Sequence, residues 1–194
     1  MKSIILLITM IIGIIMSQIL RVNIQMVNTS INIILTVLLF LIGFDLGLDV
    51  KKIIESIKEV RKEKYLPIFT IISSTLAGIM TTITLNINIK TSLAISLGMG
   101  WYSFAGPYIT THINVYYGTI ALITNMIREA ITYMILPILP KRYKRAGIVI
   151  GGATTMDTTL PIIERYGGKK LVGPALYHGI LITLLVPMIL SALT

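Results

Sequence analysis

Apolar residues run in stretches of about 20 along almost the whole chain, a length that matches the hydrocarbon core of a bilayer. Five of these stretches are unbroken and cover about residues 4–20, 31–48, 66–85, 118–139 and 171–193. We predict that each forms a transmembrane helix. The first stretch resembles a signal peptide, but it is long for one, and no small-residue cleavage site follows it. We therefore expect the mature chain to keep it.

Two further apolar stretches are interrupted. Residues 91–111 contain three glycines and a proline, and residues 146–163 contain Gly151, Gly152 and Pro161. Glycine and proline destabilise the interior of a helix. We predict that each stretch is a re-entrant hairpin of two half-helices, one entering from outside and one from the cytoplasm. A pair of full spans with a further turn is the alternative.

The positive charge of the chain sets its topology. The net charge is +9, and 13 of the 17 Lys and Arg residues lie in residues 51–64, 141–145 and 165–170. The positive-inside rule makes these loops cytoplasmic, and the loops around Arg21 and Lys90, with one basic residue each, face outside. If both broken stretches crossed fully, residues 141–145 would lie outside. Because the charge belongs to short loops between apolar runs, we expect no nucleic-acid partner.

A weak internal repeat appears at an offset of 50 residues. Residues 116–118 match 166–168, and residues 130–137 match 180–187. Each half is a broken hairpin followed by a span, and the two hairpins enter from opposite sides, as in the inverted repeats of secondary transporters. We therefore predict an all-α polytopic membrane protein with five long transmembrane helices and two re-entrant or broken hairpins. It forms one transporter domain, with scaffold helices in 1–90 and the two repeats in 91–140 and 141–194.

Composition excludes several classes of protein. With 55% hydrophobic and 13% charged residues, the chain is too apolar for a water-soluble domain of this size. It has no cysteine, so disulfides, thiolate metal sites and cysteine nucleophiles are excluded. It has no His-Glu-x-x-His motif, and the segment around Asp45 lacks the Gly-x-Gly-Asp of intramembrane aspartyl proteases. We expect no enzyme activity, no metal and no cofactor.

Most of the eight acidic residues have a simple interpretation. Glu55, Glu59 and Glu63 alternate with lysines on a solvated face. Glu164 lies at a membrane edge, and Asp49 is interpreted as an interfacial anchor. Asp45, near the cytoplasmic end of the second span, fits an anchor and a functional group equally well.

Glu129 lies in the middle of a span, where an unpaired charge costs at least about 3 kcal/mol. Asn125 and Tyr133 lie on the same helix face, so this stripe is expected to line something other than lipid. Arg128 points about 100° away. The alternative for Glu129 is a structural ion pair with an arginine.

Asp157 lies in the second break among four threonines, Thr154, Thr155, Thr158 and Thr159. We expect Thr158 or Thr159 to cap the following half-helix, whose positive end suits an anion, while Asp157 suits a cation. A zwitterion with an extra positive charge, such as lysine, fits both. The alternative is that Asp157 is only a cap.

Aromatic and polar side chains in the first break and the last span complete the candidate site. Trp101, Tyr102 and Ser103 lie among glycines, where aromatic faces can pack on alkyl stems or attract an ammonium group, although they also suit interfacial anchors. His178 is interpreted as a proton relay or as a hydrogen-bonded link between helices.

Several motifs resemble the LysO-type lysine exporter family. They are residues 98–106, 125–129, 152–161 with Gly167 and Gly168, His178 with Gly179, and 184–187. They follow the family's order and cover about residue 31 to the C-terminus, and the Trp-Tyr-Ser and Ala-Thr-Thr-Met-Asp runs are the most specific. The resemblance implies export of L-lysine and of analogues such as thialysine. Carried over by position, the required intramembrane acids are Glu129 and Asp157.

The chain departs from the longer members of that family, which carry an additional N-terminal membrane part. In split versions that part is a small separate membrane protein. We therefore expect a homodimer, or a complex with a small N-terminal-type membrane subunit.

The sequence thus predicts a multi-pass protein of the cytoplasmic membrane that exports lysine by proton-coupled antiport. Glu129 and Asp157 would bind the substrate ammonium group and protons in turn. The full set of predicted substrate- and proton-binding residues is Glu129, Asp157, Asn125, Trp101, Tyr102, Ser103, Thr154, Thr155, Thr158, His178 and Asp45. The alternative function is a non-catalytic membrane subunit or a channel for another small cation or amino acid, without saturable flux that depends on a pH gradient.

Overall fold

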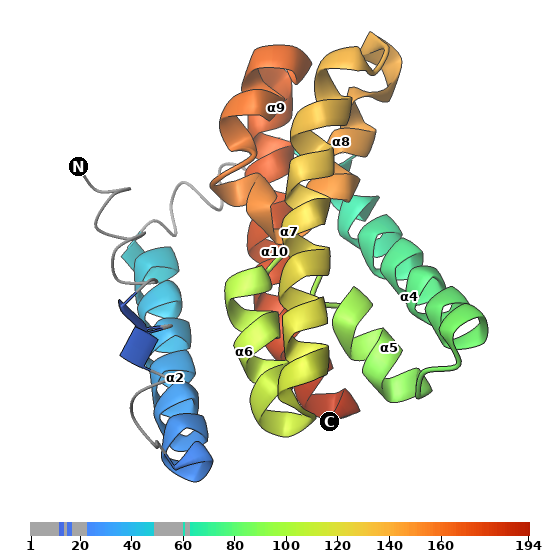
Figure 1. Ribbon diagram of the computed structural model, residues 1–194. Helices are drawn as coiled ribbons and strands as arrows, with labels where there is room; N and C mark the ends of the chain where they lie inside the picture. The colour runs from blue at the N-terminus through green and yellow to red at the C-terminus, as the bar shows by residue number, and fades with distance from the viewer. Residues whose placement is uncertain (1–11, 14, 17–22, 49–59, 61–62) are drawn as a thin grey trace.

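The computed structural model describes residues 12–13, 15–16, 23–48, 60 and 63–194, and this part of the chain is helical without strands. Four of its helices are long and apolar enough to cross a membrane. They are α2 (Ile24–Leu48), α4 (Leu66–Leu85), α7 (Val115–Ile138) and α10 (Val172–Leu193) (Figure 1). They match four of the five predicted spans. Most of the first predicted span, Asp49 and most of the basic loop 51–64 lie outside the described residues.

Helix α2 begins earlier than the apolar run predicts, at Ile24 rather than at residue 31. The Asn23 side chain accepts a hydrogen bond from the Gln25 amide at 2.9 Å and so caps the helix start. The hydroxyl of Thr29 donates to the Gln25 carbonyl four residues earlier, also at 2.9 Å. Polar residues in this segment therefore bond within the helix, which is why they do not end it.

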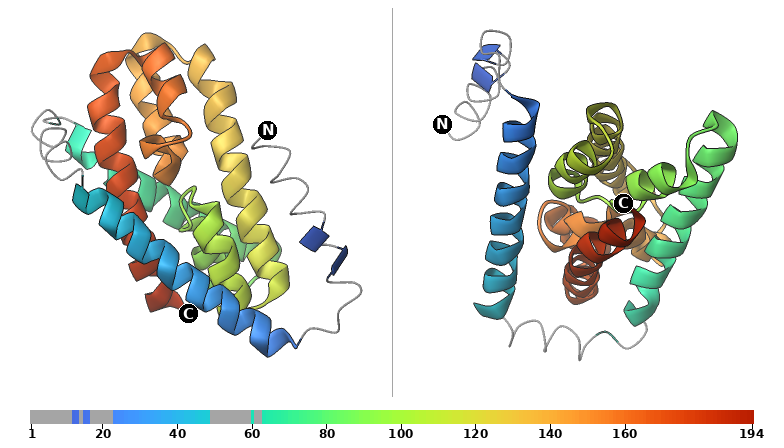
Figure 2. Two further views of the ribbon diagram at one scale, coloured as in Figure 1. Left: turned by 90° about the vertical axis from the view of Figure 1, so that its left-hand side faces the viewer. Right: turned by 90° about the horizontal axis from the view of Figure 1, so that it is seen from below.

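Both interrupted stretches form pairs of short helices. The first pair is α5 (Ile89–Ser96) and α6 (Tyr102–His112). The second is α8 (Lys144–Gly151) and α9 (Leu160–Gly167), with a 3-10 helix, η3 (Gly152–Met156), between them. The chain reverses direction within each pair, and the α7–α8 and α9–α10 connections lie at the opposite end of the bundle from the α4–α5 and α6–α7 connections (Figures 1 and 2).

The two breaks contact each other through their backbones in the middle of the bundle. The Ala153 amide donates a hydrogen bond to the Met99 carbonyl at 2.9 Å. Gly152 has a φ of +66°, and a Cβ atom there would overlap the Met99 carbonyl oxygen. Gly100 has a φ of +91°, and its Cβ would lie 2.6 Å from the Gly151 carbonyl oxygen. The crossing therefore requires glycine on both sides.

Alanine substitutions at two glycines with positive φ test this crossing. Gly168, with a φ of +86°, has no atom within 4 Å of a Cβ, so Gly168→Ala introduces backbone strain of about 1–3 kcal/mol and no clash. Gly152→Ala adds the overlap with Met99. We expect a larger loss of thermal stability for Gly152→Ala, measured by thermal unfolding of the purified protein in detergent. Equal melting temperatures for the two variants would contradict this description of the crossing.

Candidate functional site

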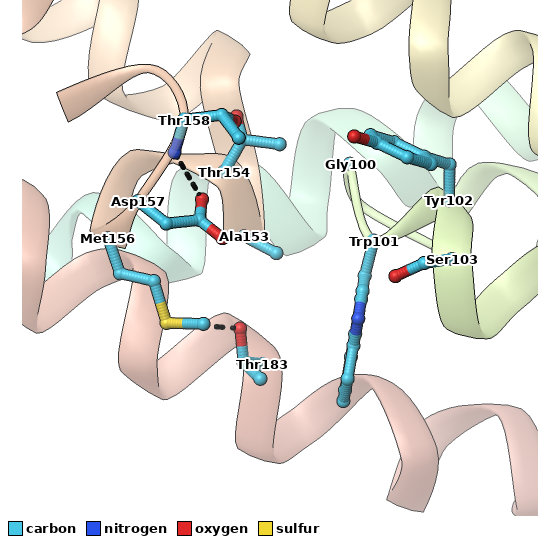
Figure 3. Close-up of a pocket in the computed structure, with 10 residues that line it drawn as sticks. All are labelled: Gly100, Trp101, Tyr102, Ser103, Ala153, Thr154, Met156, Asp157, Thr158 and Thr183. Atoms are coloured by element: carbon cyan, nitrogen blue, oxygen red, sulfur yellow. Dashed lines mark hydrogen bonds between the residues drawn. The ribbon is translucent and has the colours of Figure 1, made fainter. Parts of the chain in front are cut away.

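A small cavity of about 70 Å³ lies where the two breaks face each other. Its wall comes from the first break and the start of α6, from the second break, and from α10: Gly100, Trp101, Tyr102, Ser103, Ala153, Thr154, Met156, Asp157, Thr158 and Thr183. Figure 3 shows Trp101 and Tyr102 on one side of the cavity and Asp157 on the other. The fold thus brings together six of the predicted site residues, Trp101, Tyr102, Ser103, Thr154, Asp157 and Thr158.

Glu129 of α7 adds a second carboxylate beside this cavity. Its side chain lies near those of Tyr102 and Asp157. The ion pair found among the described residues is elsewhere, between Arg145 Nε and Glu63 Oε1 at 2.7 Å. The arginine partner considered for Glu129 is therefore absent from the part of the chain that the structure describes.

Asp157 follows η3, and its Oδ1 accepts a hydrogen bond from the Thr158 amide at 2.6 Å. The next two amides also have internal acceptors: Thr159 N donates to Thr154 O at 2.9 Å, and Leu160 N donates to Asp157 O at 3.3 Å. Thr159 occupies the N-cap position of α9, but its side chain makes no capping bond and lies 3.2 Å from the Thr154 hydroxyl. The predicted threonine side-chain cap of this helix was therefore wrong.

The polar face of α7 contacts both breaks. Asn125 bonds to the first break, and the Tyr133 hydroxyl donates a hydrogen bond to the Thr158 carbonyl in the second. Glu129 lies between them on the same helix face. The stripe that the sequence predicts on this helix is thus the surface against which the two breaks are held.

Asn125 itself does not line the cavity. It is 2% exposed, and its Oδ1 accepts a hydrogen bond from the Gly100 amide at 2.7 Å. Its Nδ2 donates to the carbonyls of Ile95, at 3.2 Å, and Ala121, at 2.8 Å. Because both N–H groups and the carbonyl are occupied, Asn125 fixes the first break in place.

Thr155 and His178 lie behind the second break. Thr155 Oγ1 is 2.9 Å from the Ala175 carbonyl and 3.1 Å from His178 Nδ1. His178 is fully buried, and its Nε2 is 2.8 Å from the hydroxyl of Thr70 on α4. His178 therefore links η3, α4 and α10, which agrees with its interpretation as a hydrogen-bonded link between helices.

One predicted site residue has a side chain outside the described part, and two residues that line the cavity were not predicted from the sequence. Asp45 lies on α2, and its side chain is outside the described residues. Met156 and Thr183 line the cavity, and the Thr183 hydroxyl lies 3.6 Å from the Met156 sulfur. Neither breaks the apolar pattern in a way that marks it. The described residues contain no group of three His, Asp or Glu side chains that could hold a metal ion.

Comparison with known proteins identifies the family. The profile of the lysine exporter LysO family matches residues 7–194. Lysine exporter LysO of Escherichia coli is 34% identical over 131 residues, which are 68% of this chain and 44% of that protein. A putative lysine exporter of Haemophilus influenzae is 35% identical over 123 residues, 63% of each chain.

The chain spans about half the length of the curated relatives it matches. No solved structure matches it. The family profile nevertheless covers almost the whole sequence, including both breaks and the cavity between them. On this basis the chain is a multi-pass membrane protein that belongs to the lysine exporter LysO family.

Proposed function

We propose that this protein exports L-lysine, and analogues such as thialysine, from the cytoplasm in exchange for protons. The observation that carries the proposal is the Asp157 carboxylate in the cavity wall, with the Glu129 carboxylate of α7 near it. Charged side chains at membrane depth are costly and mark transport pathways. The two relatives are named a lysine exporter and a putative lysine exporter, which supports lysine as the substrate.

The exchange follows from the repulsion between the two carboxylates. Two ionised carboxylates close together in a medium of low dielectric constant repel each other strongly. Either a proton or the ammonium group of lysine relieves this repulsion. The site is therefore suited to hold one or the other, and the departure of one cation favours the binding of the next.

The cavity as described is smaller than the substrate. A volume of about 70 Å³ has room for a few water molecules only. Binding of lysine therefore requires the two breaks to move apart. The rings of Trp101 and Tyr102 offer apolar faces for the alkyl stem, and the carboxylates offer a place for the ammonium group.

We further propose that both helix pairs are re-entrant hairpins related by an inverted repeat. The short helices support this topology. Helices α5, α8 and α9 have eight residues each, or about 12 Å, which is less than half of a hydrocarbon core about 30 Å thick. In this arrangement residues 91–140 and 141–194 are the two repeats, and residues 1–90 provide scaffold helices.

Single-cysteine labelling tests the topology, because the chain has no native cysteine. A cysteine at Lys90 and one at Tyr116 should both react with a membrane-impermeant reagent from outside. Cysteines at Arg142 and Lys170 should react only from the cytoplasm. Opposite sides for Lys90 and Tyr116 would instead mean that residues 91–111 cross the membrane fully.

Removing either carboxyl charge tests the proposed function. We expect Glu129→Gln and Asp157→Asn each to lower the initial rate of lysine export in proteoliposomes by about tenfold or more, a barrier change of at least about 1.4 kcal/mol. Both changes keep the size of the side chain and remove the titratable charge. Glu164→Gln, at an exposed position of α9, is the matched control and should export normally. Normal export by either of the first two variants, with the protein folded, contradicts a transport role for that residue.

We also propose that the working unit is a homodimer or a complex with a small membrane protein. The apolar windows of α2 and α4 are only 6% and 17% buried. A groove of about 470 Å³, lined partly by the small residues Ser73, Ser74 and Ala77, runs beside α4 and offers close packing to another helix.

Mass measurement in nanodiscs, with transport assayed on the same sample, tests the oligomeric state. We expect the active fraction to have the mass of a dimer or of a heteromer, because the small residues of α4 offer close packing to another helix. A homogeneous monomer that exports lysine would refute the proposal.

A further inference from the structure

Arg128 is a cation on α7 that the proposed exchange does not use. It is adjacent to Glu129 in sequence but bonds on another side of the helix. Its Nε donates to the Ile150 carbonyl at 2.6 Å, its Nη2 to the Val149 carbonyl at 3.0 Å, and its Nη1 to the Ser74 hydroxyl at 2.9 Å. The guanidinium therefore bonds to the end of α8 and to α4 at once.

The end of α8 needs such a partner. The last carbonyls of a helix have no amide within the helix to bond to, and a cation near that end is favoured by the helix dipole. The planar guanidinium can bond to two neighbouring carbonyls together, which the single ammonium group of lysine cannot do in the same geometry. The Thr70 hydroxyl adds a further bond to the Val149 carbonyl at 3.1 Å.

Helix α7 also holds the end of α5, which is the leading half of the first hairpin. Asn125, three residues before Arg128, bonds to the Ile95 carbonyl near the end of α5 and to the Gly100 amide in the first break. Helix α7 thus carries two side chains that fix the leading halves of both hairpins. Because each leading half runs directly into a break, α7 determines how far apart the two breaks lie.

We propose that Arg128 is a positioning residue for substrate binding. By bonding to Val149 and Ile150 it fixes the end of α8, and with it the segment that runs through η3 to Asp157. Arg128 thereby sets the position of the Asp157 carboxylate relative to Glu129 on its own helix. This inference rests on the proposed function, because its consequence is the affinity of the site for lysine.

The test compares lysine binding and transport kinetics of the full chain in liposomes. We expect Arg128→Lys to raise the Kd and KM for lysine by about tenfold, roughly 1.4 kcal/mol, with Vmax per folded protein changed much less. Thr70→Val removes one of the bonds to Val149 and also the contact with His178, so it should raise both constants, while Thr70→Ser, which keeps the hydroxyl, should match the wild type. Ser74→Ala removes only the bond to α4 and should leave the KM unchanged.

Each outcome decides between this role and a purely structural one. A wild-type protein without saturable lysine binding contradicts the proposed function, and the inference falls with it. If the wild type binds lysine and Arg128→Lys has an unchanged Kd, the inference is overturned while the proposed function stands. This holds even if less of the variant folds. A KM in Ser74→Ala as high as in Arg128→Lys also overturns it, since the bond to α4 would then be the important one. If Arg128→Lys does not fold, Arg128→Gln, which keeps a donor for one of the two carbonyls, takes its place, and a Kd equal to that of the wild type overturns the inference.

Discussion

Backbone groups inside a bilayer have to form hydrogen bonds with other parts of the protein, because hydrocarbon offers them no partner. This constraint is most severe at the two helix breaks, where the regular bonding of the helix stops. The breaks satisfy it partly through each other, by the bond from the Ala153 amide to the Met99 carbonyl. Side chains of α7 supply much of the rest, with Asn125 bonding to the first break and Arg128 to the end of α8.

The features that stabilise the breaks also position the candidate site. Glycines at the crossing let the two backbones approach closely, so the side chains just beyond them, Tyr102 and Asp157, face the same small cavity. Glu129 lies on α7 between Asn125 and Tyr133, the two side chains that hold the breaks. In the proposed exchange, a movement that separates the breaks would change the surroundings of both carboxylates and so would couple the substrate to protons.

Regular features of this fold were predictable from the sequence. The unbroken apolar runs predict α4, α7 and α10 to within three residues at each end, and glycine and proline mark both breaks. Periodicity also places Asn125 and Glu129 on one face and Arg128 on another. It cannot predict their partners, because Arg128 bonds to carbonyls more than 20 residues away, whose position depends on the packing of α8.

Errors in the prediction of the site arose where the backbone is irregular. In η3 the side chains follow a 3-10 helix, so Thr154 faces the cavity while Thr155 points to His178 behind it.

The proposed exchange of lysine for protons is tested most directly by lysine efflux from proteoliposomes with an imposed pH gradient, recorded together with internal pH. We predict saturable efflux that is faster with an acidic exterior, with protons entering as lysine leaves. Efflux that is indifferent to the pH gradient, without proton entry, would contradict it.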